Sequence, residues 1–219
     1  MVPINNTTME HELLAWLPAG STCRRLGIPR GKATLRPEDL PAYLAQATQL
    51  AKAFAAADID LVVYGCTAAG FLAGPDRDAA VAAELAEVTG KPVVTTANSM
   101  IAALRELGAQ NVAVVTPYLD LVNERLQAFL EQAGIGVKSL ASFRAQSVDE
   151  LAAITPAQIA ALARETMRPG CDALFIACSQ LPTRDILGDL ERELGCPVWS
   201  SIRATSWYTC RTADLSHAQ

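Results

Sequence analysis

Short apolar runs alternate with helical patterns along the chain, and this alternation limits the fold more than any other feature. Five runs of four to six residues are bounded by turn residues, which is typical of strands buried on both faces of a sheet. These runs are residues 61–65, 92–96, 111–116, 173–177 and 197–200. Residues 21–28 are a candidate for a further strand, and we interpret the opening Val2-Pro3-Ile4 as the end of another strand.

Alanine-rich segments between the runs predict helices, and several of these segments end at a glycine suited to a C-terminal cap. The expected helices are residues 37–57, 76–89, 98–107, 118–133, 155–167, 183–194 and 202–213. Strands that alternate with helices predict an α/β fold in which helices cover both faces of a mostly parallel sheet.

The two halves of the chain are loosely similar. The segment that ends at Cys66 resembles the segment that ends at Cys178, and the two cysteines lie 112 positions apart. We therefore predict two pseudo-symmetric α/β lobes, with the functional site in the crevice between them. The first lobe would comprise residues 1–97 and 203–219, and the second residues 98–202.

Composition excludes several classes of function. The net charge is −5 without a basic run, so nucleic-acid binding is not expected. No apolar stretch reaches the length of a membrane-spanning helix, and no signal peptide is visible, so we expect a cytoplasmic protein that does not enter the membrane. The only histidines, His11 and His217, lie near the chain ends, which argues against a histidine-rich metal site or a Ser-His-Asp triad.

Cys66 and Cys178 carry the chemistry that the sequence predicts. Each follows a predicted buried strand, where ligands of open α/β sheets bind, and a helix starting there would lower the thiol pKa. The residues that follow, Thr67 and then Ser179, add hydroxyl and backbone N–H groups suited to a carboxylate. We interpret the other cysteines as packing residues: Cys23, Cys171, Cys196 and Cys210.

Two other polar positions allow two interpretations each. The run from Asn5 to Glu10 would cap a helix or offer amide groups to a substrate. Tyr118 would pack on a helix or direct its hydroxyl into the crevice.

The motifs Gly65-Cys66-Thr67 and Ala177-Cys178-Ser179 resemble the aspartate/glutamate racemase superfamily over nearly the whole chain. Within it, Asn6-Thr7-Thr8-Met9-Glu10 is similar to the opening motif of maleate cis-trans isomerases. Thr116-Pro117-Tyr118 with Asn123-Glu124-Arg125 resembles these isomerases and the related arylmalonate decarboxylases. The decarboxylases have glycine in place of the first cysteine, so Cys66 argues against that activity.

The resemblance implies chemistry on a small dicarboxylate that needs neither a cofactor nor a metal. The cysteine matching Cys66 would add to the alkene carbon of maleate, and the adduct would rotate and eliminate to fumarate while Cys178 handles the proton. Asn6 and Tyr118 would hold the carboxylates. We place Thr67, Ala68, Ser179 and Gln180 in the substrate-binding set as well.

The chain departs from the family in three places, one of which is the run Cys178-Ser-Gln-Leu-Pro182, which is only similar to the isomerase run after the second cysteine. Only Met1 and Val2 precede the Pro3 motif, which predicts a chain that starts late in a strand. The region that carries a substrate-contacting asparagine in the isomerases has none here, and Gln146 is the candidate replacement. Two rival functions stay open: a racemase that uses both cysteines as bases, and a non-catalytic small-carboxylate binding protein. We expect a homo-oligomer, either a dimer or a dimer of dimers.

Overall fold

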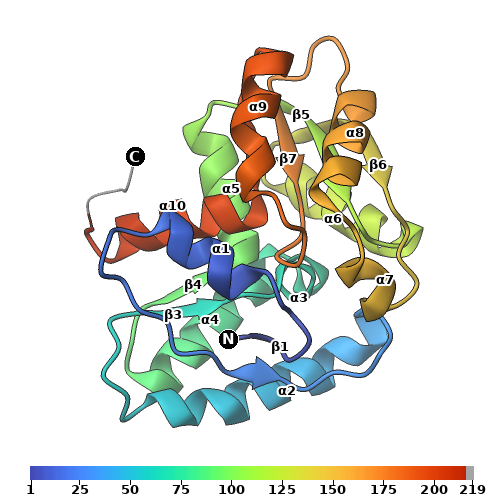
Figure 1. Cartoon of the computed structure of the whole chain (residues 1–219). Helices are drawn as coiled ribbons and strands as arrows, with labels where there is room; N and C mark the ends of the chain where they lie inside the picture. Colours follow the sequence, from blue (N-terminus) through green and yellow to red (C-terminus); the bar gives the residue numbers. More distant parts are fainter. Residues whose placement is uncertain (216–219) are drawn as a thin grey trace.

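The strands form parallel sheets in each half of the chain (Figure 1), and the predicted α/β fold is confirmed. The computed structural model describes residues 1–215. In the first half, β1 pairs with β2 and β3 with β4, and the second half has the order β6-β5-β7-β8. The strands are β1 (Val2–Pro3), β2 (Gly27–Ile28), β3 (Val62–Tyr64), β4 (Val93–Thr95), β5 (Asn111–Thr116), β6 (Gly136–Ser142), β7 (Ala173–Ile176) and β8 (Val198–Ser200).

Two backbone hydrogen bonds join the strand pairs of the first half. The Met1 amino group donates to the Val63 carbonyl oxygen at 2.7 Å, and the Gly65 N–H donates to the Met1 carbonyl oxygen at 2.7 Å. These bonds place β1 between β2 and β3, so the first half contains one continuous arrangement of short parallel strands.

Helices follow most strands, as the alternating pattern predicts. The described helices are α1 (Met9–Trp16), α2 (Leu40–Ala51), α3 (Thr67–Ala73), α4 (Pro75–Thr89), α5 (Thr96–Glu106), α6 (Asp120–Gln132), α7 (Val148–Ala152), α8 (Pro156–Thr166), α9 (Arg184–Leu194) and α10 (Ser201–Thr212). Short 3-10 helices, η1 (Pro37–Asp39) and η2 (Lys52–Phe54), flank α2, so the single helix expected over residues 37–57 is three segments. No helix described within residues 1–215 is both long and apolar enough to cross a bilayer.

The sequence did not predict β6. This strand lies at the edge of its sheet and most of its side chains are only half-buried, whereas the predicted strands β5 and β7 are buried almost throughout. An edge strand needs no continuous apolar run, so a search for such runs does not find it.

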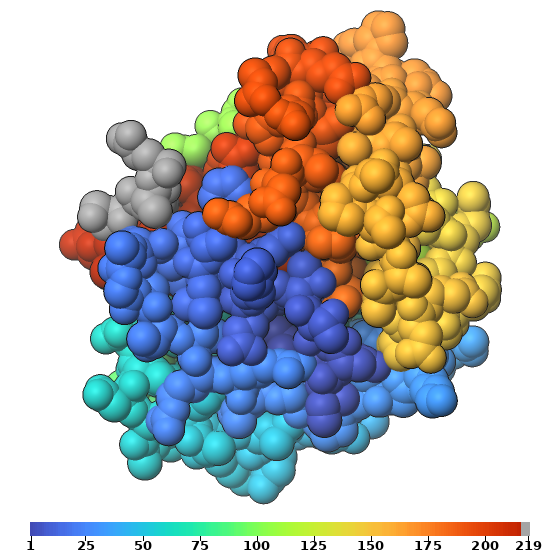
Figure 2. Space-filling model, in the orientation of Figure 1, coloured from blue at the N-terminus to red at the C-terminus, as the bar shows by residue number. Residues whose placement is uncertain are grey.

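The N-terminal segment packs directly against the second half of the chain, and Figure 2 shows the blue N-terminal residues beside the orange segment. The buried carboxylate of Glu12 on α1 accepts hydrogen bonds from the Thr183 N–H at 2.8 Å and the Arg184 N–H at 3.2 Å. These contacts place Glu12 at the N-terminus of α9, where the helix dipole favours a negative charge. Glu12 therefore fixes the two halves relative to each other.

The last helix, α10, packs against α1 and α5 (Figure 1). Of these two helices, α1 belongs to the predicted first lobe, whereas most of α5 belongs to the predicted second lobe. The division into lobes 1–97 with 203–219, and 98–202, stays a prediction, and residues 216–219 lie outside the described residues.

Candidate active site

Both predicted cysteines lie just past the carboxyl ends of buried strands and line the same pocket. Cys66 follows β3, and Cys178 follows β7. The cavity has a volume of about 40 Å³, several times the space that one water needs, which suits a small ligand. All eight residues predicted for the site line this pocket: Asn6, Cys66, Thr67, Ala68, Tyr118, Cys178, Ser179 and Gln180.

Gly65 allows β3 to approach the N-terminal segment closely. A side chain at this position would collide with the sulfur of Met9 and lie 2.8 Å from Cγ1 of Val2. Any other residue at this position would have to displace the buried side chains of Met9 and Val2. The residue before Cys66 therefore sets the position of its thiol.

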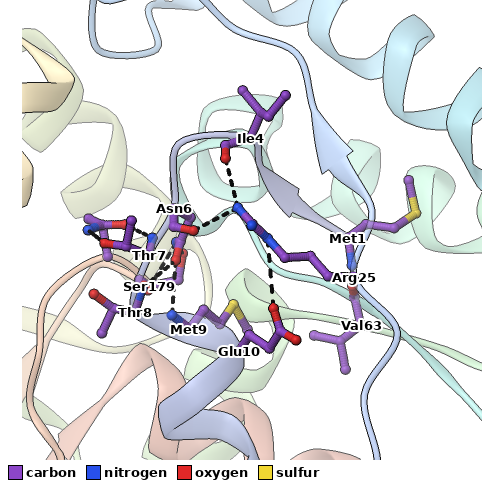
Figure 3. Close-up of polar contacts among 11 residues, drawn as sticks. Met1, Ile4, Asn6, Thr7, Thr8, Met9, Glu10, Arg25, Val63 and Ser179 are labelled. Atoms are coloured by element: carbon purple, nitrogen blue, oxygen red, sulfur yellow. Dashed lines mark hydrogen bonds and ion pairs between the residues drawn. The ribbon is translucent and has the colours of Figure 1, made fainter.

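Asn6 joins the start of α1 to the loop after β7 (Figure 3). Its side-chain oxygen accepts hydrogen bonds from the N–H groups of Thr8 at 3.0 Å and Met9 at 2.9 Å. Its amide nitrogen donates to the Ser179 carbonyl oxygen at 3.1 Å and lies 3.3 Å from the Ser179 hydroxyl. Asn6 thus performs the predicted capping role, and its amide is already hydrogen-bonded to the second half of the chain.

Ser179 and Gln180 form further contacts between the halves. The Ser179 hydroxyl donates to the Gly65 carbonyl oxygen at 2.9 Å. The Gln180 side chain accepts from the Thr7 N–H at 2.9 Å and donates to the Thr7 hydroxyl at 2.9 Å. These side chains hold the pocket walls together, which leaves their roles toward a substrate as predictions.

A buried network positions Tyr118. The Asn123 amide donates to the Tyr118 carbonyl oxygen at 2.9 Å, and the Thr116 hydroxyl donates to the Asn123 side-chain oxygen at 2.6 Å. The ring packs edge-on against Phe71, with centroids 5.4 Å apart. Its hydroxyl is buried, interacts with the Cys178 thiol, and has no nitrogen or oxygen hydrogen-bond partner among the described residues. The ring therefore packs as one interpretation expected, and a role of the hydroxyl toward a ligand stays a prediction.

Thr67 offers a second available donor. Its hydroxyl is buried without a hydrogen-bond partner within residues 1–215, at the first position of α3. Ala68 follows it, and its backbone N–H interacts with the Cys66 thiol. The pocket therefore combines two thiols with two unpaired hydroxyls, those of Thr67 and Tyr118.

The expectation of low thiol pKa values is wrong. Burial raises the pKa of both Cys66 and Cys178 above the ordinary thiol range. The N–H of Ala69 lowers the pKa of Cys66, and the N–H of Gln180, 3.4 Å from the sulfur, lowers the pKa of Cys178, but neither offsets burial. The sequence pattern could not weigh burial, and α9 begins only at Arg184, so no helix starts beside Cys178.

The structure adds two residues that the sequence did not single out. Arg30, from the loop after β2, lines the pocket, and its positive charge lowers the pKa of both Cys66 and Cys178. The buried hydroxyl of Tyr43 on α2 lies beside Cys66 and likewise lowers the pKa of that thiol. Arg30 stands two positions after β2, so the end of the strand considered at residues 21–28 was a local signal for it, whereas Tyr43 lies within a helix and has none.

Gln146 does not line the pocket. It is exposed, and its side-chain amide donates to the Arg144 carbonyl oxygen at 3.2 Å. Gln146 turns toward its own loop, which does not favour it as the replacement for the family's loop asparagine.

The remaining cysteines and His11 lie outside the pocket. Cys210 is buried, as a packing residue should be, whereas Cys171 and Cys196 are half-buried. Cys23 is exposed, so its interpretation as a core residue is wrong. His11 is exposed on α1, and His217 lies outside the described residues. Within residues 1–215, no cluster of histidine, cysteine and carboxylate side chains is suited to a metal ion.

Comparison with known proteins identifies the family. The sequence profile described as arylmalonate decarboxylase matches residues 26–219. The chain belongs to the arylmalonate decarboxylase family. A maleate isomerase from Nocardia farcinica is 31% identical over 223 residues, covering 98% of this chain and 89% of that protein. The arylmalonate decarboxylase of Bordetella bronchiseptica is 30% identical over 185 residues, covering 84% of this chain and 77% of that protein.

A solved structure from the same family is similar in fold and chemically informative. It is a Cys-to-Ser mutant of the Nocardia farcinica maleate cis-trans isomerase with a covalently bound succinylcysteine intermediate. Its TM-score is 0.90 at 30% identity, and the match covers 98% of this chain and 91% of that one. These relatives confirm the expected enzyme class, an isomerase, and support a cysteine nucleophile.

Proposed function

We propose that this protein converts maleate, or a similar small cis-dicarboxylate, to the trans isomer through a covalent adduct on Cys66. The observation that carries the proposal is that Cys66 and Cys178 line one small pocket with the unpaired hydroxyls of Thr67 and Tyr118. The succinylcysteine intermediate of the Nocardia farcinica relative supports a covalent route.

The proposed reaction needs only the substrate and two thiols. The Cys66 thiolate forms a carbon–sulfur bond to one alkene carbon, and the electron pair of the double bond moves to the other carbon, which takes a proton from Cys178. The adduct has a single bond between these carbons and rotates about it. Cys178 then removes the proton, the double bond re-forms in the trans geometry, and the carbon–sulfur bond breaks, which restores Cys66. The adduct replaces the forbidden rotation about a double bond by two easier steps.

Cys66 must lose its proton before it adds to the alkene. Burial disfavours the thiolate, whereas the charge of Arg30 and the N–H groups of Ala68 and Ala69 favour it. Arg30 and the N–H of Gln180 favour the thiolate of Cys178 in the same way, so we assign nucleophilic attack to Cys66 and proton transfer to Cys178 on the resemblance of the motif Gly65-Cys66-Thr67 to the isomerases. Because every electron and proton comes from substrate and cysteines, no step in the scheme uses a cofactor.

The carboxylates would be bound by groups that have hydrogen-bonding capacity left. Thr67 and Tyr118 have unpaired hydroxyls, so we assign them to direct contact with one carboxylate. Ala68 contributes a backbone N–H near the nucleophile. Asn6 would bind substrate only if it exchanged one of its contacts to Ser179. We assign Ser179 and Gln180 to the pocket wall beside the second thiol, Cys178.

Incubation with maleate, followed by proton NMR, tests the proposal. We expect fumarate to form, and we expect loss of turnover in both Cys66→Ser and Cys178→Ser. The Cys178→Ser variant retains the nucleophile, so intact mass should show an adduct heavier by one maleic acid. Absence of turnover by the unmodified protein at high enzyme concentration would overturn the maleate assignment.

The paired thiols also suit a racemase that uses Cys66 and Cys178 as opposed bases, and the two activities are separable. A racemase incorporates deuterium at the α-carbon of a chiral carboxylate in D₂O without forming an adduct. The isomerase forms the adduct with an achiral alkene. Detection of a covalent adduct by intact mass would therefore exclude the racemase for that substrate.

Location and assembly are further proposals from the sequence. We propose a cytoplasmic enzyme, since its thiols must remain reduced to react, and a homodimer or a dimer of dimers. Size-exclusion chromatography with light scattering would measure the assembly directly.

A further inference from the structure

Arg30 has no anionic partner in the pocket that it lines. Its Nη2 donates to the Ala33 carbonyl oxygen at 3.1 Å, while its Nε is buried and has no hydrogen-bond partner within residues 1–215. None of the ion pairs among the described residues includes Arg30. A buried guanidinium nitrogen without an acceptor is unfavourable, and a bound anion removes that penalty.

Arg30 is also the only charged side chain among the described residues that line the pocket. The lining contains neither aspartate nor glutamate, and burial keeps the thiols of Cys66 and Cys178 in their neutral form. The pocket therefore carries one positive charge, and that charge acts on both thiols. A site with this charge distribution favours anions over neutral ligands.

The loop that carries Arg30 is held over the pocket by the second half of the chain. The Val148 N–H donates to the Lys32 carbonyl oxygen at 2.9 Å, and Ala33 forms an isolated bridge with Ser147. Val148 also lines the pocket, so the loop after β2 and the start of α7 meet at its mouth. These contacts fix the backbone from which the guanidinium reaches inward.

We propose that Arg30 binds the second carboxylate of the substrate and makes the site selective for dianions over monoanions. This inference rests on the proposed function, in which Thr67 and Tyr118 bind the first carboxylate. The guanidinium presents several N–H donors in a planar fork that matches a carboxylate. Arg30 would supply the substrate contact for which Gln146 was the candidate, because Gln146 faces away from the pocket.

Binding of two related ligands tests the role of Arg30. In a Cys66→Ala background, which cannot form the adduct, the dissociation constants of maleate and its monomethyl ester would be measured by titration calorimetry. We expect Arg30→Met to weaken the binding of maleate by tenfold or more, roughly the effect of losing one hydrogen bond between charged groups. The dissociation constant of the monoester should change less than twofold, and Arg30→Lys should retain part of the preference for maleate.

Arg24→Met is the matched control, because Arg24 is exposed and does not line this pocket. It should leave both dissociation constants unchanged. Thermal melting of each variant checks folding, and an equal weakening of both ligands in Arg30→Met would overturn the inference.

The inference and the proposed function fail in different ways. If the unmodified protein isomerises maleate and Arg30→Met keeps its preference for the dianion, the role of Arg30 is wrong and the function stands. If the protein binds maleate without isomerising it, and Arg30→Met loses the preference, the function is wrong and the role of Arg30 stands. If maleate does not bind, both are overturned.

Discussion

Asp78 provides a quantitative test of the packing behind the pocket. Its side chain on α4 is only 2% exposed. One carboxylate oxygen accepts a hydrogen bond from the Thr95 hydroxyl at 2.6 Å, and the other has no partner among the described residues. Burial raises the pKa of Asp78 from 3.8 to about 6, against the opposing effects of Thr95 and the N–H of Asn98. The folded protein therefore holds this proton more tightly than the unfolded chain does.

The sign of the pH dependence follows from this difference. Below about pH 4 the carboxyl is protonated in both the folded and the unfolded state, so its ionisation does not lower the free energy of unfolding. Between about pH 4 and pH 6 the unfolded chain releases its proton first, and the free energy of unfolding falls as the pH rises. Above pH 6 the accumulated loss is about 3 kcal/mol, since each unit of pKa difference corresponds to 1.36 kcal/mol.

We expect Asp78→Asn to remove most of this loss, because asparagine is neutral and can still accept from Thr95. The variant should be more stable than the unmodified protein by about 2–3 kcal/mol at pH 7.5, and this advantage should shrink toward pH 4.5. Urea denaturation followed by circular dichroism at pH 4.5, 6.0 and 7.5 measures it. Asp76→Asn is the matched control, because Asp76 is exposed on the same helix. A stability difference for Asp78→Asn that is constant from pH 4.5 to 7.5 would refute the reasoning.

Three further predictions follow from the site and its surroundings. Asn6→Ala should lower the free energy of unfolding by about 2 kcal/mol in urea titrations, because it removes a helix cap and a buried contact between the halves; no change would show that water replaces these bonds. Gly70→Ala should destabilise by about 1–3 kcal/mol, because its new Cβ would collide with Ala97 and lie 2.7 Å from an Asp78 oxygen; an unchanged melting temperature would contradict this. Alkylation of Cys66 by iodoacetamide, followed by peptide mass spectrometry, should reach half its maximal rate above the pH of about 8.5 that is ordinary for a thiol, because burial raises its pKa; a midpoint below pH 8 would contradict the direction of that shift.

The two thiols illustrate which parts of a site can be read locally. Cys66 and Cys178 stand directly after strand signals, at strand ends of the kind where open α/β sheets bind ligands. They belong to different sheets, and it is the similarity of the two halves that predicted one crevice between them. Their pKa values were not predictable, because a local helix-end effect competes with burial, and burial depends on every element packed around the pocket.

Arg30 illustrates the opposite case. It lies in an irregular loop without a periodic or motif signal, and its role depends on how that loop crosses the pocket toward α7. Gln146 lies in the region where the resemblance implies a substrate-contacting asparagine, yet its side chain bonds to its own loop. Loop direction is set by long-range contacts, so sequence position alone does not tell which side chain reaches the pocket.

The sequence by itself determined the α/β class, the strands β5 and β7, and the pair Cys66 and Cys178, because buried parallel strands need continuous apolar runs whose ends are visible in the chain. Only the tertiary structure decided the edge strand β6, the direction of Gln146, and the presence of Arg30 beside the thiols. These features depend on which segments pack together across the two halves. Local pattern specifies what is buried in a strand, whereas charge, protonation and ligand contacts are set by neighbours far away in the sequence.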